Sequence, residues 1–402
     1  LCHYYNKIFV VLFFLAVYKF HLCRSLNLYS KSFFLCFLIH SSMELIPGMP
    51  DDIARECLVR LQYKQLPIVV SVCKSWKSEV EQPRYRRWRI EACSNQLIVV
   101  MAQACVEIND SDALQKHQAP PVYQLSVLEP NTGEWSLLPA VDVGGESHEN
   151  LPLFCQLVSV GSDLLVLGGL NPSTWEVSGS VFAYSFLTAS WRKGADMPGP
   201  RRSFFGCGVD DKSGIVYIAG GHDEEKNALK SAMAYDATRD EWTNLPDMAG
   251  ERDECKAVFQ RGKLHVIGGY STDMQGRFQT SVEALDVQTQ RWETPQDDFL
   301  STSVCPRTCS STGDDGNLII CHDGQVLELI GTKWQAVSKL PNDLTTTAYV
   351  SAWQGNLMVI GTAKFGDPYV AYLLDLETQR WRKVATPAEF SGHVQSACCL
   401  VL

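Results

Sequence analysis

Six tryptophans recur along the chain at similar intervals, and this recurrence limits the possible folds more than any other feature. The intervals run from 42 to 56 residues, the residue six positions before each tryptophan is acidic in five of the six cases, and a proline follows each within seven residues. A period of this length indicates an array in which each unit buries its apolar face only against its neighbours. The repeated tryptophans are Trp135, Trp191, Trp242, Trp292, Trp334 and Trp381.

The third unit shows most clearly what one repeat contains. An apolar stretch over 203–209 is followed by a turn, by a second stretch over 215–219 that ends in Gly220 and Gly221, and by a third stretch over 231–235 before the tryptophan. Short apolar stretches separated by turns rich in Gly and Asp are typical of β-strands, and four such strands make one propeller blade. The sequence therefore predicts an all-β propeller in which the tryptophans and paired glycines serve blade packing.

A count of the strands predicts six blades in a closed ring. The first unit supplies a second, third and fourth strand over 96–102, 122–128 and 135–138, but no innermost strand, because 84–89 continues the preceding helix pattern. Residues 392–402 form a spare strand beyond the sixth unit, and its insertion into the first blade would remove exposed strand edges. Three units lack the paired glycines and are expected to be degenerate: they carry Met101-Ala102, Cys321-His322 and Gly361-Thr362 instead.

The segment before the propeller, residues 43–88, has the periodicity of short helices. Pro50 followed by Asp51 and Asp52 favours a helix start, because acidic side chains stabilise the positive end of the helix dipole. Pro67 favours the start of a second helix that has one apolar face. Helices this few and short cannot bury enough apolar surface to be stable alone. They are therefore either a cap packed on the following domain or a module that docks to a partner.

Residues 1–42 differ from the rest of the chain. They are apolar and rich in Phe, and the first methionine is Met43. Their apolar runs over 8–18 and 33–39 are shorter than the roughly 18–20 residues that cross a membrane, so we expect no membrane association. A signal peptide, with Lys7 before an apolar run, is one alternative. We interpret the segment as translated upstream sequence, with the natural protein starting at Met43.

Composition and motifs narrow the function classes. The net charge of −10 argues against non-specific nucleic-acid binding, which needs a basic surface. The fifteen cysteines include no CxxC pair, and several lie in strand-like apolar runs, which favours reduced thiols in the cytoplasm or the nucleus over disulfides or metal ligation. The motifs of serine hydrolases, zinc proteases and phosphate-binding loops are absent from the sequence. We therefore predict no catalytic residues, no cofactor and no metal site.

Arginines stand at the expected starts of successive innermost strands, which converge near the axis of a propeller. We predict that these arginines anchor acidic groups of a protein substrate, because the guanidinium fork suits carboxylates; the alternative is that they are ordinary solvated residues. His222, in the polar loop after the second glycine pair, and Tyr270, in a related loop, are further candidate contacts. The candidate arginines are Arg201, Arg202, Arg252 and Arg307.

Residues 44–82 resemble an F-box, which has Leu-Pro near its start and Val-Cys-Lys/Arg-x-Trp near its end. Here Ile46-Pro47 and Met49-Pro50 share the first role, and 72–76 reads Val-Cys-Lys-Ser-Trp. The resemblance implies binding to a Skp-type adaptor and, through it, to a cullin-RING ubiquitin ligase. The adaptor contacts that it implies are Ile46, Pro47, Pro50, Ile53, Leu58, Leu66, Val69, Val72 and Trp76.

The glycine pairs followed by a tryptophan resemble the kelch repeat, so that residues 43–402 as a whole look like a plant F-box/kelch-repeat protein. The expected architecture is an all-α F-box module over 43–88 followed by a six-bladed kelch-type β-propeller over 89–402. The segments 198–209 and 220–229 are similar to the subgroup that marks phenylalanine ammonia-lyase or type-B cytokinin response regulators for degradation. The resemblance implies a non-catalytic substrate-recognition subunit of a Skp/cullin/F-box ligase that acts in phenylpropanoid metabolism or cytokinin signalling. A kelch scaffold without a ligase role and a metal-dependent kelch enzyme are the alternatives.

Overall fold

The computed structural model describes residues 44–92, 96–106, 121–143, 146–148, 150–313, 316–353, 355–364 and 366–402. The chain divides into two compact units, Leu1–Leu58 and Val59–Leu402. The interpretation of residues 1–42 as upstream translation lies outside the described residues. No helix in the described part of the chain is both long enough and apolar enough to cross a membrane.

The first unit contains a tight turn that leads into a helix. The turn is closed by a hydrogen bond from the Met49 N–H to the Ile46 carbonyl (3.0 Å), with Gly48 at its tip at a φ of 81°. Helix α3 (Asp51–Val59) starts directly after Pro50, as the sequence predicts. The Asp51 carboxylate accepts a hydrogen bond from the Leu45 N–H at 2.8 Å, so this acidic side chain both joins the turn to the helix and lies at the positive end of the helix dipole.

Four further short helical segments open the second unit: η1 (Tyr63–Gln65), α4 (Leu66–Val72), α5 (Lys74–Val80) and α6 (Pro83–Glu91). The second helix that Pro67 favours ends at Val72, and a separate helix follows it. The backbone at Cys73 is extended (φ −160°, ψ 165°), which ends α4, and the Cys73 sulfur accepts the Trp76 N–H at the start of α5. Because this sulfur caps the start of α5, the helix breaks between α4 and α5 although no glycine or proline stands there.

The rest of the second unit consists mainly of six four-stranded antiparallel sheets, so the predicted six-bladed propeller is confirmed. A two-stranded hairpin of β4 (Val141–Val143) and β5 (Glu146–His148) was not expected. Written from the innermost strand outward, the blades are β26 (Val394–Val401), β1 (Leu97–Ala104), β2 (Tyr123–Glu129), β3 (Glu134–Leu137); β6 (Gln156–Val160), β7 (Asp163–Leu167), β8 (Val181–Ser185), β9 (Ser190–Lys193); β10 (Gly206–Asp210), β11 (Ile215–Ala219), β12 (Ala232–Asp236), β13 (Glu241–Leu245); β14 (Lys256–Gln260), β15 (Lys263–Ile267), β16 (Val282–Asp286), β17 (Arg291–Trp292); β18 (Ser310–Ser311), β19 (Leu318–His322), β20 (Gln325–Ile330), β21 (Lys333–Lys339); and β22 (Thr346–Trp353), β23 (Asn356–Thr362), β24 (Val370–Asp375), β25 (Arg380–Val384).

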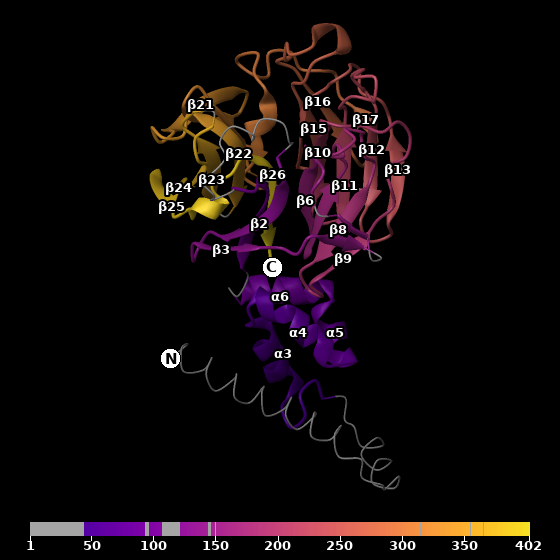
Figure 1. Cartoon of the computed structure of the whole chain (residues 1–402), viewed down its shortest axis with the longest axis vertical. Helices are drawn as coiled ribbons and strands as arrows, with labels where there is room; N and C mark the ends of the chain where they lie inside the picture. The colour runs from indigo at the N-terminus through magenta and orange to yellow at the C-terminus, as the bar shows by residue number, and fades with distance from the viewer. Residues whose placement is uncertain are drawn as a thin grey trace. The chain divides into compact units, whose positions relative to one another are not determined.

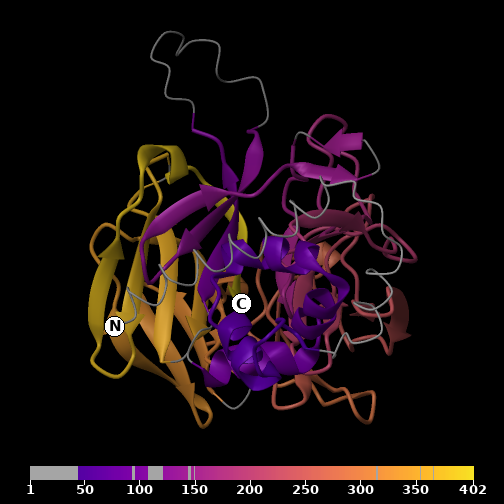
Figure 2. The ribbon, with the colours of Figure 1, turned by 90° about the horizontal axis from the view of Figure 1, so that it is seen from below.

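The last strand closes the ring, as the strand count predicts. Strand β26 pairs with β1 from Leu97↔Val401 to Gln103↔Val394, so the two ends of the propeller sequence share one sheet. In Figure 1 the yellow β26 belongs to the same blade as the purple strand β2, with β1 between them in the sheet. The innermost strand of every blade contacts the innermost strands of both neighbours, and Figure 2 shows the sheets set around a common centre.

The six repeated tryptophans join neighbouring blades. Each indole N–H donates a hydrogen bond to the preceding blade or to the connection that leaves it, and in five of the six cases the acceptor residue lies four positions after the preceding tryptophan. The repeat in the sequence is therefore a repeat of the joints between blades. The donor and acceptor residues are Trp135 and Ala385, Trp191 and Pro139, Trp242 and Ala195, Trp292 and Pro246, Trp334 and Phe299, and Trp381 and Ser338.

The apolar core of the propeller also lies between blades. Leu165 and Leu167 of β7 pack in one cluster with Val216 and Ile218 of the next blade, and all four side chains are fully buried. Full burial of such a side chain stabilises a fold by about 1.5–3 kcal/mol. Most of the stability therefore comes from contacts that exist only once the neighbouring blade has formed, as expected for a repeat array.

Helix α6 is fastened to the end of the chain by a buried arginine. Arg89 is 1% exposed, and its guanidinium donates to the carbonyls of Val59 (2.9 Å), Leu61 (2.6 Å) and Leu402 (3.3 Å). Arg89 therefore links the first and last residues of the second unit.

Candidate functional site

Two of the four candidate arginines are buried inside their blades. Arg202 and Arg252 are 1% and 2% exposed. Nη1 of Arg202 donates to the carbonyls of Gly220 and Ser231 at 3.2 Å, Nη2 donates to the Ser231 hydroxyl at 2.8 Å, and Arg252 repeats these three contacts in the next blade. Their guanidinium groups hold the loops that follow the glycine pairs. The prediction that they face acidic groups of a substrate therefore needs correction, because their charged ends lie inside the protein.

The two buried arginines differ in their counter-charge. Nε of Arg252 donates to the buried Glu283 carboxylate at 3.0 Å. The equivalent position in the preceding blade is Met233, and within the described chain the buried Nε of Arg202 has no hydrogen-bond partner. Burial lowers the pKa of Arg202 to about 10. The same set of arginine hydrogen bonds therefore occurs once with a buried ion pair, at Arg252, and once without one, at Arg202.

The other two candidate arginines are exposed. Nη1 of Arg201 lies 3.8 Å from a Glu224 carboxylate oxygen, and both side chains are more than half exposed. Arg307 lies three positions before its strand β18, whereas Arg202 and Arg252 lie four positions before theirs. Pro306 takes the equivalent place in that blade, so the four arginines do not form one ring.

A cavity of about 410 Å³ opens among the loops of the three blades that carry glycine pairs. We call it the loop pocket. Its walls come from the loops after β7, β11 and β15 and from the residues that lead into β10 and β14. Two predicted contacts, His222 and Tyr270, lie in it, and none of the four arginines lines it. The residues that line the loop pocket are Leu170, Trp175, Val177, Phe204, His222, Asp223, Glu224, Lys226, Ala228, Asp253, Glu254, Tyr270, Thr272 and Gln275.

The second glycine of each pair brings the pocket loops together. Gly221 has a φ of +82°, and a Cβ at this position would lie 2.4 Å from the Ser203 carbonyl oxygen. The next residue, His222, forms an isolated antiparallel bridge with Ser203. The other two glycine-pair blades contain equivalent bridges, Leu153↔Leu170 and Asp253↔Tyr270. A side chain on this glycine would push apart the two backbones that form the base of the pocket.

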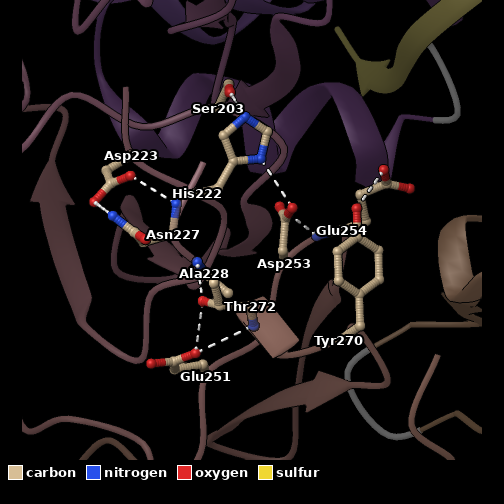
Figure 3. Close-up of polar contacts among 10 residues, drawn as sticks. All are labelled: Ser203, His222, Asp223, Asn227, Ala228, Glu251, Asp253, Glu254, Tyr270 and Thr272. Atoms are coloured by element: carbon tan, nitrogen blue, oxygen red, sulfur yellow. Dashed lines mark hydrogen bonds and ion pairs between the residues drawn. The ribbon is translucent and has the colours of Figure 1, made fainter. Parts of the chain in front are cut away.

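A chain of polar side chains crosses the floor of the loop pocket (Figure 3). Nε2 of His222 lies 2.9 Å from the Ser203 hydroxyl, and Nδ1 of the same ring lies 2.9 Å from an Asp253 carboxylate oxygen. The order Ser–His–Asp is that of a hydrolase triad, but Ser203 is 0% exposed. Its hydroxyl is therefore out of reach of a substrate in this structure, and the chain fixes the orientation of the imidazole.

On the other side of the pocket, Tyr270 and Glu254 face each other. The Tyr270 hydroxyl donates to the Glu254 carboxylate at 2.9 Å (Figure 3). Burial and this hydrogen bond to a carboxylate raise the pKa of Tyr270 well above its ordinary value. The phenol therefore stays protonated at physiological pH and remains the donor in its hydrogen bond to Glu254.

Two aromatic residues of the pocket lining, Trp175 and Phe204, and a third that packs on Phe204, Phe154, have unusual backbone geometry. Phe154, Phe204 and Trp175 all have a positive φ (58°, 56° and 62°), which is rare for bulky side chains. The rings of Phe154 and Phe204 lie 4.8 Å apart, and Trp175 is 57% exposed. Glu254, which follows the bridge residue of the next blade as Phe154 and Phe204 do in theirs, also has a positive φ (51°), so the repeat itself enforces this geometry at those positions.

A second cavity, of about 210 Å³, lies among the innermost strands and shares Phe204 and Glu254 with the loop pocket. Its lining has a different charge pattern, because Lys256 and Arg307 contribute cations. Burial lowers the pKa of Lys256 from its ordinary value. The cavity among the innermost strands is therefore more basic than the loop pocket beside it.

The candidate adaptor contacts divide by exposure. Several are buried within this chain: Leu58, Leu66, Val69 and Trp76 are between 0% and 8% exposed. Pro47, Pro50 and Ile53 are exposed, with Ile53 at 49%, and Ile46 and Val72 are partly buried. Ile68, which is not among the predicted adaptor contacts, is 53% exposed. An adaptor can therefore contact the exposed residues directly: Pro47, Pro50, Ile53 and Ile68. The buried residues maintain the shape of the module that presents them.

Sequence reasoning missed the residues that line most of the loop pocket. Trp175, Phe204 and Glu254 lie on different repeats and show no motif. One signal was available: the hydrogen bonds from Arg202 to Ser231 and from Arg252 to Ser281 both span 29 residues. An Arg/Ser pair repeated at one spacing indicates an internal partner rather than a surface anchor. Among the described residues, no three His, Cys, Asp or Glu side chains are grouped so that they could hold a metal ion.

Two family models match the chain in the order that the fold shows. Residues 46–88 match the F-box domain, and residues 155–333 match the KLHDC2/KLHL20/DRC7 Kelch-repeats domain. The first match covers α3 to α5 and ends within α6, and the second covers the glycine-pair blades and most of the fifth blade.

Full-length relatives show the same arrangement. F-box/kelch-repeat protein At1g80440 of Arabidopsis thaliana is 48% identical over 365 residues, which are 89% of this chain and 99% of the relative. F-box/kelch-repeat protein At1g15670 of the same plant is 47% identical over 363 residues, with the same coverage of both chains. F-box/kelch-repeat protein At2g44130 is 32% identical over 66% of this chain and 68% of its own. The chain therefore belongs to the plant F-box/kelch-repeat protein family.

Proposed function

We propose that this protein is the substrate-recognition subunit of a Skp/cullin/F-box ubiquitin ligase. The observation that carries the proposal is the presence, in one chain, of an F-box over residues 46–88 and a closed propeller with a pocketed loop face. In this role the chain performs no bond chemistry. It holds a target protein near the ubiquitin-loaded partner and so raises the effective concentration of the target's lysines.

The exposed apolar residues of the F-box supply the adaptor contact in this proposal. Ile53 and Ile68 are about half exposed, and Pro47 and Pro50 are exposed beside the start of α3. Burying an isoleucine side chain against a partner contributes about 1.5–3 kcal/mol. Two such residues therefore provide enough of the binding free energy for their loss to be measurable.

The test is a pull-down of the full chain with a purified Skp-type adaptor. We expect the wild type to bind the adaptor and the double variant Ile53→Asp/Ile68→Asp to lose binding by at least about 100-fold, because two charges would be buried in an apolar contact. The matched control is Ile90→Asp, an isoleucine that is 43% exposed on α6 and lies outside the F-box match.

The control also separates binding from folding. Ile90→Asp should bind the adaptor as the wild type does, and the thermal unfolding midpoints of all three proteins should agree within a few degrees. If the wild type fails to bind any Skp-type adaptor, the ligase proposal fails. If the double variant binds normally, the ligase role stands but the contact surface is placed elsewhere.

For the target itself, we propose phenylalanine ammonia-lyase or a type-B cytokinin response regulator, in the cytoplasm or the nucleus. The support is the similarity of segments 198–209 and 220–229 to the subgroup that marks these proteins for degradation. Segment 220–229 includes five residues that line the loop pocket, and this supports its role in target recognition. Ubiquitination of each purified candidate by the reconstituted ligase decides between them, and ubiquitination of neither removes both.

A further inference from the structure

The loop pocket has the size of a binding site for a side chain or small ligand. Its volume of about 410 Å³ falls within the roughly 300–1,000 Å³ of typical ligand sites. It lies on the loop face of the propeller, where three loops from different blades converge. Because its base is fixed by the glycine-mediated bridges, the pocket exists before any ligand arrives.

The walls of the pocket carry an excess of negative charge. Four carboxylates line it against a single lysine, Lys226, and most of their contacts are with uncharged or weakly basic donors. Asp223 accepts from the amide of Asn227 (3.1 Å), and Glu254 accepts from the hydroxyl of Tyr270 (2.9 Å). The lining carboxylates are Asp223, Glu224, Asp253 and Glu254.

The ion pair that one of these carboxylates makes with an arginine outside the pocket is loose. Arg201 lies 3.8 Å from Glu224 in a pair that is more than half exposed on both sides, and such pairs contribute little to stability. An incoming cation therefore replaces a weak contact when it binds Glu224. An incoming carboxylate would meet like charges.

Aromatic surface completes the pocket. Trp175 is 57% exposed and Phe204 stacks on the His222 ring with centroids 5.3 Å apart. Aromatic faces attract ammonium and guanidinium groups and cover the methylene groups of long basic side chains. A pocket with carboxylates at one side and aromatic faces at another matches the two parts of such a side chain.

We infer that the loop pocket binds a lysine or arginine side chain from an extended segment of the target protein. This inference deepens the proposed function and rests on it only for the identity of the occupant as a ligase target. It reverses the charge that the sequence predicted for this face, because the arginines expected to bind acidic groups are buried or lie outside the pocket.

The experiment uses the full chain without the adaptor and a phage-displayed library of random 12-residue peptides as the probe. We expect the selected peptides to share a Lys or Arg. Changing that residue to Gln in the synthetic peptide should weaken its Kd about tenfold, since it removes the charge that the carboxylates recognise. The double variant Glu224→Gln/Glu254→Gln should weaken the original peptide to the same degree and bind the Gln peptide no more weakly than the wild type does.

The matched control is Glu377→Gln/Glu389→Gln, two exposed carboxylates outside the pocket lining, which should leave the Kd unchanged. Trp175→Asn serves as a second test if the Gln variant does not fold, because Asn tolerates a positive φ while the aromatic face is lost. It should weaken the peptide several-fold. A selection that yields no peptide, peptides that share no basic residue, or pocket variants that bind as the wild type does would each overturn the inference.

The adaptor pull-down on the same variants keeps this inference separate from the proposed function. The pocket variants should still bind the adaptor, and Ile53→Asp/Ile68→Asp should still bind the peptide. Adaptor binding without a basic-residue preference removes the pocket inference and leaves the ligase role in place. Peptide binding without adaptor binding does the reverse.

Discussion

Blades with a glycine pair and blades without one form similar sheets but end differently on the loop face. In the glycine-pair blades, β6–β9, β10–β13 and β14–β17, each of the two inner strands has five residues, and the pairing stops where the glycines begin. In the blades that contain β1 and β22, the corresponding strands have seven or eight residues and pair continuously apart from one irregularity. In these three blades the regular sheet therefore ends at the glycine pair, whereas the fifth blade, which lacks the pair, has inner strands β18 and β19 of only two and five residues.

The difference places the pocket in one arc of the ring. After each glycine pair, one isolated bridge re-forms and the chain continues as a loop, and these three loops build the loop pocket. In the β22 blade, pairing continues to Thr346↔Thr362, where a glycine-pair blade would already have begun its loop. The comparison indicates that regular strand pairing and a shaped binding face exclude each other at this position.

The largest effect should come from removing the counter-charge of the buried Arg252 in one glycine-pair blade. Changing Glu283 to Leu leaves the Arg252 guanidinium buried without its counter-charge and removes the acceptor of the Ala249 N–H (2.7 Å). Loss of one partner of a buried ion pair costs about 3–5 kcal/mol. Urea unfolding of the variant should show this decrease in the free energy of unfolding.

The neighbouring blade supplies the control. Met233 stands where Glu283 would be, and Pro198, at the position of Ala249, has no N–H to satisfy. Met233→Leu conserves volume and polarity and should cost less than about 1.5 kcal/mol. Equal losses in the free energy of unfolding for the two variants would mean that the ion pair between Arg252 and Glu283 adds nothing to stability.

A smaller effect should follow from adding one methyl group to a glycine pair. In Gly221→Ala the new Cβ meets the Ser203 carbonyl oxygen at 2.4 Å on a backbone with φ +82°, so we expect a loss of at least about 2 kcal/mol in the free energy of unfolding. Gly324→Ala, in a blade without the pair, has a similar φ of +70° but nothing within 4 Å of the new Cβ. It should cost only about 1 kcal/mol.

These two alanine variants also separate an effect on the stability of the protein from an effect on the shape of the loop pocket. Because Gly221 supports the bridge at the base of the loop pocket, its variant should weaken pocket peptides, whereas the Gly324 variant should not. A Gly221→Ala protein with unchanged stability and unchanged peptide affinity would contradict the role assigned to the pair.

The propeller, its six blades and its closure could be predicted because they depend on signals that repeat or can be counted. The tryptophan period reflects a hydrogen bond made at every joint between blades, so the same residues recur at each joint. The unpaired strand at 392–402 completes a count that the first blade leaves short. Patterns of this kind survive without knowledge of three-dimensional contacts.

The site could be predicted only in part, because it depends on contacts between repeats. Arg202 and Arg307 look equivalent in the sequence, but a shift of one residue relative to the following strand leaves one buried and one exposed. The loop pocket could not be predicted from the sequence because residues such as Trp175 and Glu254 line one cavity from different blades. His222 was found for its polar surroundings, although its hydrogen bonds to Ser203 and Asp253 could not be read from the chain.

The smallest effect we predict compares two joints of the ring. Trp292 donates to the Pro246 carbonyl (2.7 Å) at a joint inside the glycine-pair arc, and Trp135 donates to the Ala385 carbonyl (2.8 Å) at the joint where the chain ends meet. Replacing either with Phe removes one hydrogen bond and keeps most of the apolar contact, at a cost of about 0.5–1.5 kcal/mol. If strand β26 closes the ring as firmly as the continuous chain joins the other blades, thermal unfolding should show equal losses. A larger loss for Trp135→Phe would mean that the closing joint opens first and that the propeller unfolds from its first blade.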